Sequence, residues 1–374
     1  MLNTIIIFAL AIVAVMSPLL SIYMRRQRFE SPDTWDDGLP VSVIIAVHDD
    51  AEDLERNLPA FLRQDYPPGF DVIVVAAKSE DETEDVLKRF NGDERLYTTF
   101  IPDSSRYISR RKLAITLGVK AARNPLLLFT DITCRPTSDK WIKSMAGCMK
   151  SDKNIVIGMT VFGEGTPLPC RFQRLYDDIA CANEASCGTA YRSESKNIMM
   201  LREEFMSRRG FEGNLKYMRG EYDFIINKYA KEGGTAITNS PDALLVERCP
   251  TKREWRNHRL FYMETRRHLQ RNARHRAPIL TDGILLHASL LLPMAATSYG
   301  IAMGDIAVVA AAPTALILSL ILRTLLARKR MAQFSCKIPV WKVVPLEVGS
   351  HWRKLIQWFS YKRADEYDFI THKI

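Results

Sequence analysis

The first 24 residues constrain the fold most, because Met1 to Met24 carries no charged side chain. The segment is rich in Ile, Leu, Val and Ala, and it is long enough to cross a hydrocarbon layer that needs about 20 apolar residues. It ends at Arg25, Arg26 and Arg28, whereas a cleaved signal peptide would carry its charge before a shorter apolar core. We therefore predict a retained transmembrane anchor over residues 1–24.

Two further apolar stretches lie near the other end of the chain, at 283–303 and 306–322. They predict a transmembrane hairpin over 280–326. The second stretch is short for a span and Arg323 would have to reach the interface, so a tilted or re-entrant hairpin is the alternative. Arg and Lys crowd the outer flanks of the hairpin. By the positive-inside bias, the middle of the chain faces the cytoplasm and the turn at 304–305 lies outside.

The net charge of +9 belongs mainly to these membrane flanks, where anionic lipid attracts cations. This distribution disfavours a nucleic-acid binder, which would interleave its cations with aromatic side chains on one face. Residues 327–374 form a basic tail. Within it, an apolar set is spaced for one helical face: Trp352, Leu355, Ile356 and Phe359. We predict an interfacial helix, with a helix that covers the soluble domain as the alternative.

The region 39–276 alternates between strand and helix signals. The run VSVIIAV at 41–47 is typical of a strand buried on both faces. Ser79 and Glu82 have the spacing of a capping box at a helix start. The expected elements are strands at 41–47, 71–77 and 126–129, and helices at 54–62, 79–90 and 110–122. The order predicts an α/β fold with a mostly parallel sheet and helices on both faces.

Such sheets bind ligands beyond the carboxyl ends of their strands, where His48, Lys78 and Asp131 fall. Asp131 lies in the stretch FTDITCRP, directly after a buried strand and before a proline. An acid at this position can hold a metal or a substrate. The alternative is an aspartate that only turns the chain.

Four segments resemble the membrane-associated family 2 glycosyltransferases with a GT-A fold, of the bacterial surface-polysaccharide type. They occur in the family's order, and they are PVSVIIAVHDDAEDLERNLPAFLRQDYP, VVAAKSEDETEDVL, SRRKLAITLGVKAARNPLLLFTDITCRPTSDKWI and GFEGNLKYMRGEYDFIINKYA. The resemblance covers about residues 40–270 and extends to the hairpin. It implies a GT-A fold for the region 39–276.

The family's chemistry implies a role for Asp131. Transfer of a sugar requires positive charge at the departing nucleoside diphosphate, which a divalent cation held by a DxD motif usually supplies. Asp131 matches the first acid of that motif, and Thr133 stands at the second. A hydroxyl replaces a carboxylate poorly, so we expect Mg²⁺ or Mn²⁺ to bind weakly at Asp131 and Thr133.

The resemblance also suggests nucleotide-sugar contacts for His48, Asp81, Arg111, Lys112 and Asp131. Each of the first four has a plainer alternative. His48 can be an ordinary strand-end histidine, and Asp81 can supply charge in the first turn of a helix. Arg111 and Lys112 can lie on a solvated helix face. The family's nucleotide-contacting acids are replaced here by two alanines, at 76 and 77.

The catalytic base is expected after Gly220. The family's Gly-Glu-Asp becomes Gly220-Glu221-Tyr222-Asp223, so a tyrosine stands at the usual base position. We predict Asp223 as the base, with Glu221 close behind. The family's QxxRW motif is missing, which argues against a polymer-extruding synthase. Trp255 and its basic neighbours can replace it, although a membrane-proximal face is favoured.

Together these features predict an inverting glycosyltransferase in the bacterial inner membrane, with its catalytic domain facing the cytoplasm. The expected partners are a nucleotide-sugar donor, a lipid-linked or glycan acceptor and membrane lipids, without nucleic acid. The alternative is a catalytically degenerate relative that keeps the fold as a membrane partner protein.

Overall fold

The computed structural model describes residues 1–33, 38–102, 108–270, 272–336, 338–365 and 369 of the 374-residue chain. The chain divides into two compact units. We call residues 1–27, 168–183 and 271–356 the helical unit, and residues 28–167, 184–270 and 357–374 the α/β unit. Residues 168–183 lie within the soluble region in sequence, but they group with the helical unit.

A seven-stranded sheet of order β3-β2-β1-β4-β8-β6-β9 forms the centre of the α/β unit. Its strands are β1 (Val41–Val47), β2 (Phe70–Ala76), β3 (Leu96–Phe100), β4 (Leu126–Thr130), β6 (Ile155–Gly158), β8 (Ile198–Leu201) and β9 (Thr235–Thr238). The four strands from β3 to β4 are parallel, as are β6 and β9, whereas β8 runs antiparallel to both of its neighbours. The predicted mostly parallel α/β sheet is confirmed.

A second, three-stranded sheet lies in the same unit, with the order β5-β10-β7. Its strands are β5 (Cys134–Pro136), β7 (Thr160–Phe162) and β10 (Leu245–Glu247). The helices of the unit are α2 (Ala51–Leu62), α3 (Thr83–Arg89), α4 (Arg110–Ala121), α5 (Trp141–Ala146), α7 (Arg202–Ser207), α8 (Glu221–Tyr229) and α9 (Lys252–Arg267). Two more helices have residues in both units, α6 (Leu168–Ser186) and α12 (Val343–Arg363).

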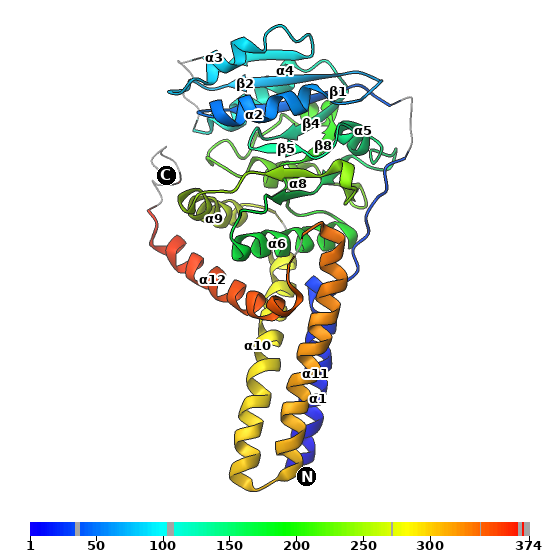
Figure 1. The fold of residues 1–374 in the computed structure, drawn as a ribbon, viewed down its shortest axis with the longest axis vertical. Helices are drawn as coiled ribbons and strands as arrows, with labels where there is room; N and C mark the ends of the chain where they lie inside the picture. The colour runs from blue at the N-terminus through cyan, green and yellow to red at the C-terminus, as the bar shows by residue number, and fades with distance from the viewer. Residues whose placement is uncertain (34–37, 103–107, 271, 337, 366–368, 370–374) are drawn as a thin grey trace. The chain divides into compact units, whose positions relative to one another are not determined.

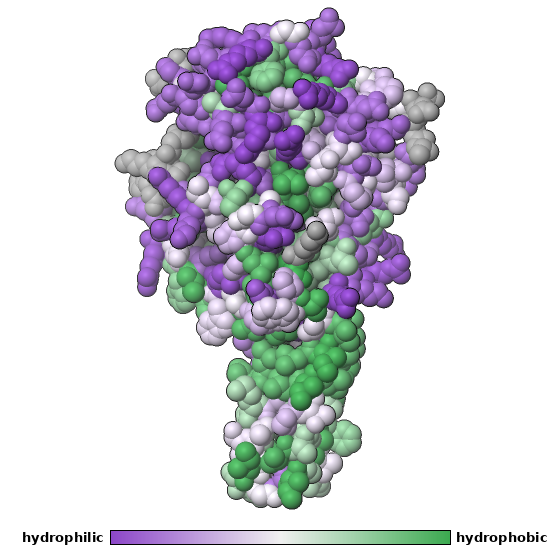
Figure 2. All heavy atoms as spheres, viewed as in Figure 1, coloured by the Kyte–Doolittle hydropathy of each residue, from purple (hydrophilic) through white to green (hydrophobic). Residues whose placement is uncertain are grey.

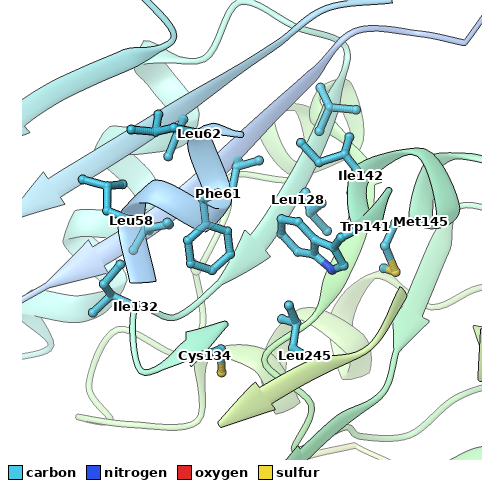
Figure 3. Close-up of a cluster of buried hydrophobic side chains, with 14 of the residues drawn as sticks. Leu58, Phe61, Leu62, Leu128, Ile132, Cys134, Trp141, Ile142, Met145 and Leu245 are labelled. Carbon is cyan, nitrogen blue, oxygen red and sulfur yellow. The ribbon is translucent and has the colours of Figure 1, made fainter. Parts of the chain in front are cut away.

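The hydrophobic core of the α/β unit explains the strand pattern. Every residue of β1 is buried, as its unbroken apolar run predicts. Figure 3 shows α2 packing its apolar face toward β4, β5 and α5. At this contact the rings of Phe61 and Trp141 lie edge to face, with centroids 5.4 Å apart. Burying such side chains is the main force that holds helices against the sheet.

The capping box predicted at Ser79 and Glu82 is wrong. α3 begins at Thr83, and no side chain caps it from Glu82. The Ser79 hydroxyl instead accepts a hydrogen bond from the Asp49 amide at 3.1 Å. Asp81 accepts from the Thr83 amide at 3.0 Å, so the acid two residues before Thr83 satisfies the helix start.

Among the described residues of the helical unit, three helices are long and apolar enough to cross a membrane by length and composition. They are α1 (Leu2–Leu20), α10 (Asn272–Met303) and α11 (Ile306–Met331), and the apolar stretches extend over 2–20, 275–303 and 306–334. The helices lie side by side (Figure 1), and Figure 2 shows apolar residues covering them. α11 is long enough for a full span, so its length does not require the re-entrant alternative.

Arg323 does not reach toward an interface, and that expectation is wrong. Its guanidinium is buried in the helical unit and donates hydrogen bonds to three other helices. The acceptors are Ser17 of α1 at 3.0 Å, Asp282 of α10 at 3.2 Å, and Glu347 of α12 at 2.5 and 2.7 Å. A buried cation is tolerated here because carboxylates on neighbouring helices pair with it.

The apolar set predicted in the tail does lie along one helix, α12. Trp352, Leu355, Ile356 and Phe359 are all exposed on it, with Ile356 at 63%. Glu347 and His351 of the same helix contact Arg323 and Asp282 respectively, which fixes the first half of α12 to the helical unit.

Candidate active site

Asp131 directly follows the last residue of β4, which pairs in parallel with β1. The side chain is only 3% exposed. Its Oδ1 accepts hydrogen bonds from the backbone amide of Thr133 at 2.9 Å and from the Thr133 hydroxyl at 2.8 Å. The two positions of the predicted metal motif therefore face each other, joined by a turn that the aspartate itself stabilises.

Two cations contact the other oxygen of Asp131. Arg111 from the first turn of α4 is one, and the second is Lys196, whose Nζ lies 3.3 Å from Oδ2. Lys196 also donates to the Thr133 hydroxyl at 2.9 Å and contacts Glu247 of β10 at 2.7 Å. Burial alone would raise the pKa of Asp131, but these two cations hold it well below its ordinary value.

The first turn of α8 completes this group of charges. Glu221 Oε1 lies 2.5 Å from Nε of Arg111, and the Tyr222 hydroxyl donates to the carbonyl oxygen of Thr130 at 3.0 Å. Burial raises the pKa of the Tyr222 phenol above its ordinary value of 10.0. We call the following set the charge cluster: Arg111, Asp131, Thr133, Lys196, Glu221, Tyr222 and Glu247.

Asp223 contacts other residues than Glu221 does. Its Oδ1 accepts a hydrogen bond from the Ser193 amide at 3.2 Å and lies 3.5 Å from the Arg266 guanidinium. Adjacent helical residues point about 100° apart, which separates Asp223 from Glu221 and Tyr222. These two contacts connect Asp223 to Ser193 and to Arg266 of α9.

Lys112, for which a nucleotide-sugar contact is predicted, contacts the segment before α8. Its ammonium is buried and donates to the backbone oxygens of Asn214, Tyr217 and Arg219, and to the side chain of Asn214. Burial lowers the pKa of Lys112 to about 7. Lys112 therefore holds the segment that leads to Gly220 and α8, and the structure does not bring it to the charge cluster.

Asp81 and His48 lie in the loops after β2 and β1. Asp81 Oδ2 accepts from the Ala51 amide at 2.9 Å, so the carboxylate ties the two loops together. Burial alone would raise the pKa of Asp81, but hydrogen bonds from Thr83 and these amides lower it. His48 is exposed, with Nε2 3.6 Å from Asp49. Asp81 precedes α3 and is not in its first turn, so its contacts are those of a loop acid that accepts backbone amides. The predicted ligand contact of the exposed His48 stays a prediction.

The charged run on α9 is divided between the surface and the interior. His258 is exposed, whereas Arg259 is 1% exposed and pairs with Glu194 at 3.4 Å. The Tyr262 ring lies between two guanidiniums, with Arg259 at 3.8 Å and Arg266 at 3.4 Å from its centroid. Part of this run is therefore an internal ion network of the α/β unit.

Comparison with known proteins identifies the fold that carries this site. Residues 42–220 match the family model described as Glycosyl transferase family 2. The chain carries a glycosyl transferase family 2 domain. The matched region contains Asp131 and Lys196 and ends at Gly220, the residue before α8. The predicted family 2 glycosyltransferase domain is thus confirmed over residues 42–220.

Three individual proteins are similar to this chain. Over 106 residues, 28% of this chain, the sequence is 29% identical to Glycosyltransferase AglE of Haloferax volcanii, and the match spans 33% of that protein's length. The mannosyltransferase PcManGT from Pyrobaculum calidifontis, in complex with GDP-Man and Mn²⁺, superposes over 96% of both chains with a TM-score of 0.55 and 17% identity. S. aureus TarS 1-349 superposes on 84% of this chain and 92% of its own, with a TM-score of 0.44 and 15% identity. The likeness to PcManGT confirms the predicted GT-A-like fold.

The residues at the predicted metal position do not fit a divalent cation. Within the described ranges, no three His, Cys, Asp or Glu side chains are placed to hold a metal ion. Both oxygens of Asp131 already have partners, and the Thr133 hydroxyl accepts from Lys196. A divalent ion at Asp131 would meet an ammonium and a guanidinium, which repel it.

Sequence reasoning missed Lys196 and Glu247. Glu247 ends the short apolar run ALLVE, so the strand-end rule that selected Asp131 would also have selected it. Lys196 lies in a polar segment before β8, and no local pattern distinguishes it from other lysines. Its position beside Thr133 comes from the pairing of β8 with β4.

Proposed function

We propose that this domain transfers a sugar from a nucleotide-sugar donor to a hydroxyl group of an acceptor, with inversion at the anomeric carbon. The acceptor oxygen forms a bond to the anomeric carbon, and the bond from that carbon to the diphosphate oxygen breaks. A carboxylate takes the hydroxyl proton, and the nucleoside diphosphate leaves with the electron pair. The protein must therefore supply a base and positive charge near the diphosphate.

The charge cluster at the carboxyl end of β4 is the observation that carries this proposal. Open α/β sheets bind their ligands at this edge. Arg111 and Lys196 provide cations there, and Glu221 provides a carboxylate next to Arg111. The charge cluster contains five charged side chains: Arg111, Asp131, Lys196, Glu221 and Glu247. A scaffold protein would have no need for such a largely buried group, since desolvating charges is unfavourable.

The contacts favour Glu221 over Asp223 as the base. Glu221 is connected through Arg111 to Asp131, and its second carboxylate oxygen, Oε2, has no hydrogen-bond partner among the described residues. Asp223 is engaged by Ser193 and Arg266 instead. We expect Glu221→Gln to lower kcat by at least about 10²-fold, the scale of general base catalysis, and Asp223→Asn to lower it less.

We further propose that the acceptor is a lipid-linked or glycan molecule at the inner face of the bacterial cytoplasmic membrane, as in surface-polysaccharide synthesis. Three helices with the length and composition of membrane spans support a membrane location. The exposed Trp352 and Ile356 on α12 support it too, because aromatic and aliphatic side chains on a basic helix favour the lipid interface.

Nucleotide binding tests the proposal. The purified full chain in detergent is titrated calorimetrically with a panel of nucleoside diphosphates and nucleotide sugars, with EDTA or with Mn²⁺. We expect at least one nucleotide to bind, and Asp131→Asn to weaken that binding by disrupting Arg111 and Lys196. Asp152→Asn, at an exposed aspartate paired with Lys153, is the matched control. Binding to no member of the panel in either condition would refute the proposal.

A degenerate, non-catalytic relative is the second candidate, because Tyr222 occupies the position where the family has its base. Turnover separates the two. The degenerate relative would be favoured if the chain bound a nucleotide sugar but neither transferred the sugar to an acceptor in a membrane extract nor hydrolysed the donor. Transfer that Glu221→Gln or Asp223→Asn abolishes would exclude it.

A further inference from the structure

Lys196 places its ammonium beside both positions of the predicted metal motif. Nζ lies 2.9 Å from the Thr133 hydroxyl and 3.3 Å from Oδ2 of Asp131. Glu247 holds the ammonium from a third direction at 2.7 Å. The carboxylates of Asp131 and Glu247 flank the Lys196 ammonium and compensate its positive charge in this largely buried position. A fixed positive charge therefore stands at the motif.

Arg111 brings a second positive charge to Asp131. Its Nη2 contacts Asp131 and its Nε contacts Glu221 at 2.5 Å. These contacts leave Nη1 without a hydrogen-bond partner among the described residues. The Arg111 side chain is 21% exposed and that of Lys196 is 18% exposed, so both side chains are partly accessible.

Each carboxylate of the charge cluster already has a cationic partner. Asp131 contacts both cations, Glu221 contacts Arg111, and Glu247 contacts Lys196. A divalent ion needs carboxylate oxygens that converge on a shared point, and here an ammonium and a guanidinium take those oxygens. The neutral hydroxyl of Thr133 at the position of the second acid and the Lys196 ammonium beside it both make the local charge more positive.

We propose that this site stabilises the departing diphosphate without a divalent cation, using the Lys196 ammonium and the Arg111 guanidinium in its place. This inference rests on the proposed function. The planar guanidinium offers Nη1 to a phosphate oxygen, and the lysine acts as a point charge on a flexible stem. Thr133 suits this arrangement because its neutral hydroxyl accepts a hydrogen bond from Lys196, whereas a second carboxylate would recruit a metal.

The test measures nucleotide binding and metal binding separately. UDP and GDP are titrated in parallel into the purified full chain, with EDTA and with Mn²⁺, and bound Mn²⁺ is counted directly by electron paramagnetic resonance. We expect the nucleotide that binds to do so with the same affinity, within about threefold, in both conditions. Lys196→Gln should weaken it about tenfold or more through the loss of a charge-assisted hydrogen bond, and Lys196→Arg should restore most of the affinity.

Two further variants are compared: one removes a lysine outside the charge cluster, and the other restores the second acid of the motif. Lys88→Gln removes an exposed lysine that also pairs with an aspartate, and it should leave nucleotide affinity unchanged. The double variant Thr133→Asp/Lys196→Ala restores a two-acid motif without the lysine. We expect it to bind one Mn²⁺ and to require that ion for nucleotide binding. Thermal unfolding in detergent establishes that each variant is folded.

The outcomes are distinguishable. Stoichiometric Mn²⁺ binding by the wild-type chain, with nucleotide binding that EDTA abolishes, would overturn this inference and leave the proposed function intact. Unchanged nucleotide affinity in a folded Lys196→Gln variant would also overturn it. If no nucleotide in the panel described under the proposed function binds, with or without Mn²⁺, the proposed function itself is refuted.

Discussion

A Cβ added to Gly220 would lie 2.0 Å from Cγ2 of Thr265, so α8 begins in direct contact with α9. Gly220 has a φ of 86°, a left-handed conformation that L side chains rarely adopt. The two constraints act together at the residue that places Glu221 and Tyr222.

Gly220→Ala is therefore expected to lower the free energy of unfolding by on the order of 2 kcal/mol or more, and to reduce turnover strongly. Thermal unfolding and sugar transfer measure the two effects. Thr265→Ser removes Cγ2 and keeps the hydroxyl that donates to Phe261. Adding it to Gly220→Ala should recover part of the stability but not the part due to φ. Wild-type stability in the single variant would contradict the prediction.

Lys112→Met should destabilise the α/β unit although it removes no ion pair. The variant leaves three backbone carbonyls and the Asn214 side chain without their donor, and unsatisfied buried groups typically cost about 1–3 kcal/mol each. We expect a loss on the order of 3 kcal/mol, measured by chemical or thermal unfolding.

The same variant should lower turnover, because the segment released by Lys112 leads into Gly220 and α8. Lys120→Met, at an exposed position of α4, is the control and should change neither property. A Lys112→Met protein of normal stability that failed to bind nucleotide would instead favour the diphosphate contact predicted from the sequence.

Arg323→Met should destabilise the helical unit by about 3–5 kcal/mol, because it leaves Asp282 and Glu347 buried without their cation. The midpoint of thermal unfolding in detergent measures the loss. Arg328→Met, at an exposed position on α11, is the matched control. Combining Arg323→Met with Asp282→Asn and Glu347→Gln should recover much of the stability, since the uncompensated charges are gone. No recovery would mean that the hydrogen bonds, rather than charge balance, carry the effect.

Asp50 should make stability depend on pH. Burial, with the nearby charge of Asp131, raises the pKa of Asp50 from 3.8 to about 6. Between these values the folded chain binds more protons than the unfolded chain, so the free energy of unfolding falls as the pH rises from about 4 to about 6. The decrease contributed by this group should be on the order of 1–3 kcal/mol.

Unfolding of the wild-type chain and of Asp50→Asn is compared across that pH range. The variant cannot ionise at position 50, so its stability should decline less than that of the wild type. Parallel pH curves for the two proteins would show that Asp50 titrates at its ordinary value.

Elements of the fold that depend on local pattern could be predicted from the order of the amino acids. Unbroken apolar runs predicted β1, β2 and β4, and helical spacing predicted α2 and α4. The spacing of apolar residues along the chain reflects which faces of a strand or helix are buried. β3, with the sequence LYTTF, was missed because it lies partly exposed at the sheet edge and has no such run. The rule that ligand-binding residues follow the carboxyl ends of parallel strands also placed Asp131 correctly, directly after β4.

Which charged side chains meet depends on how the chain folds. Lys196 contacts Thr133, which is 63 residues away in the chain, and Arg323 pairs with acids on two other helices. Lys112 donates hydrogen bonds to backbone carbonyls, including that of Arg219. Local pattern cannot encode these partners, because electrostatic interactions depend on distance and burial between elements that the fold brings together. Thr133 is an example: its sequence position shows only that a neutral residue replaces the second acid of the motif. In the folded protein its hydroxyl accepts a hydrogen bond from the Lys196 ammonium.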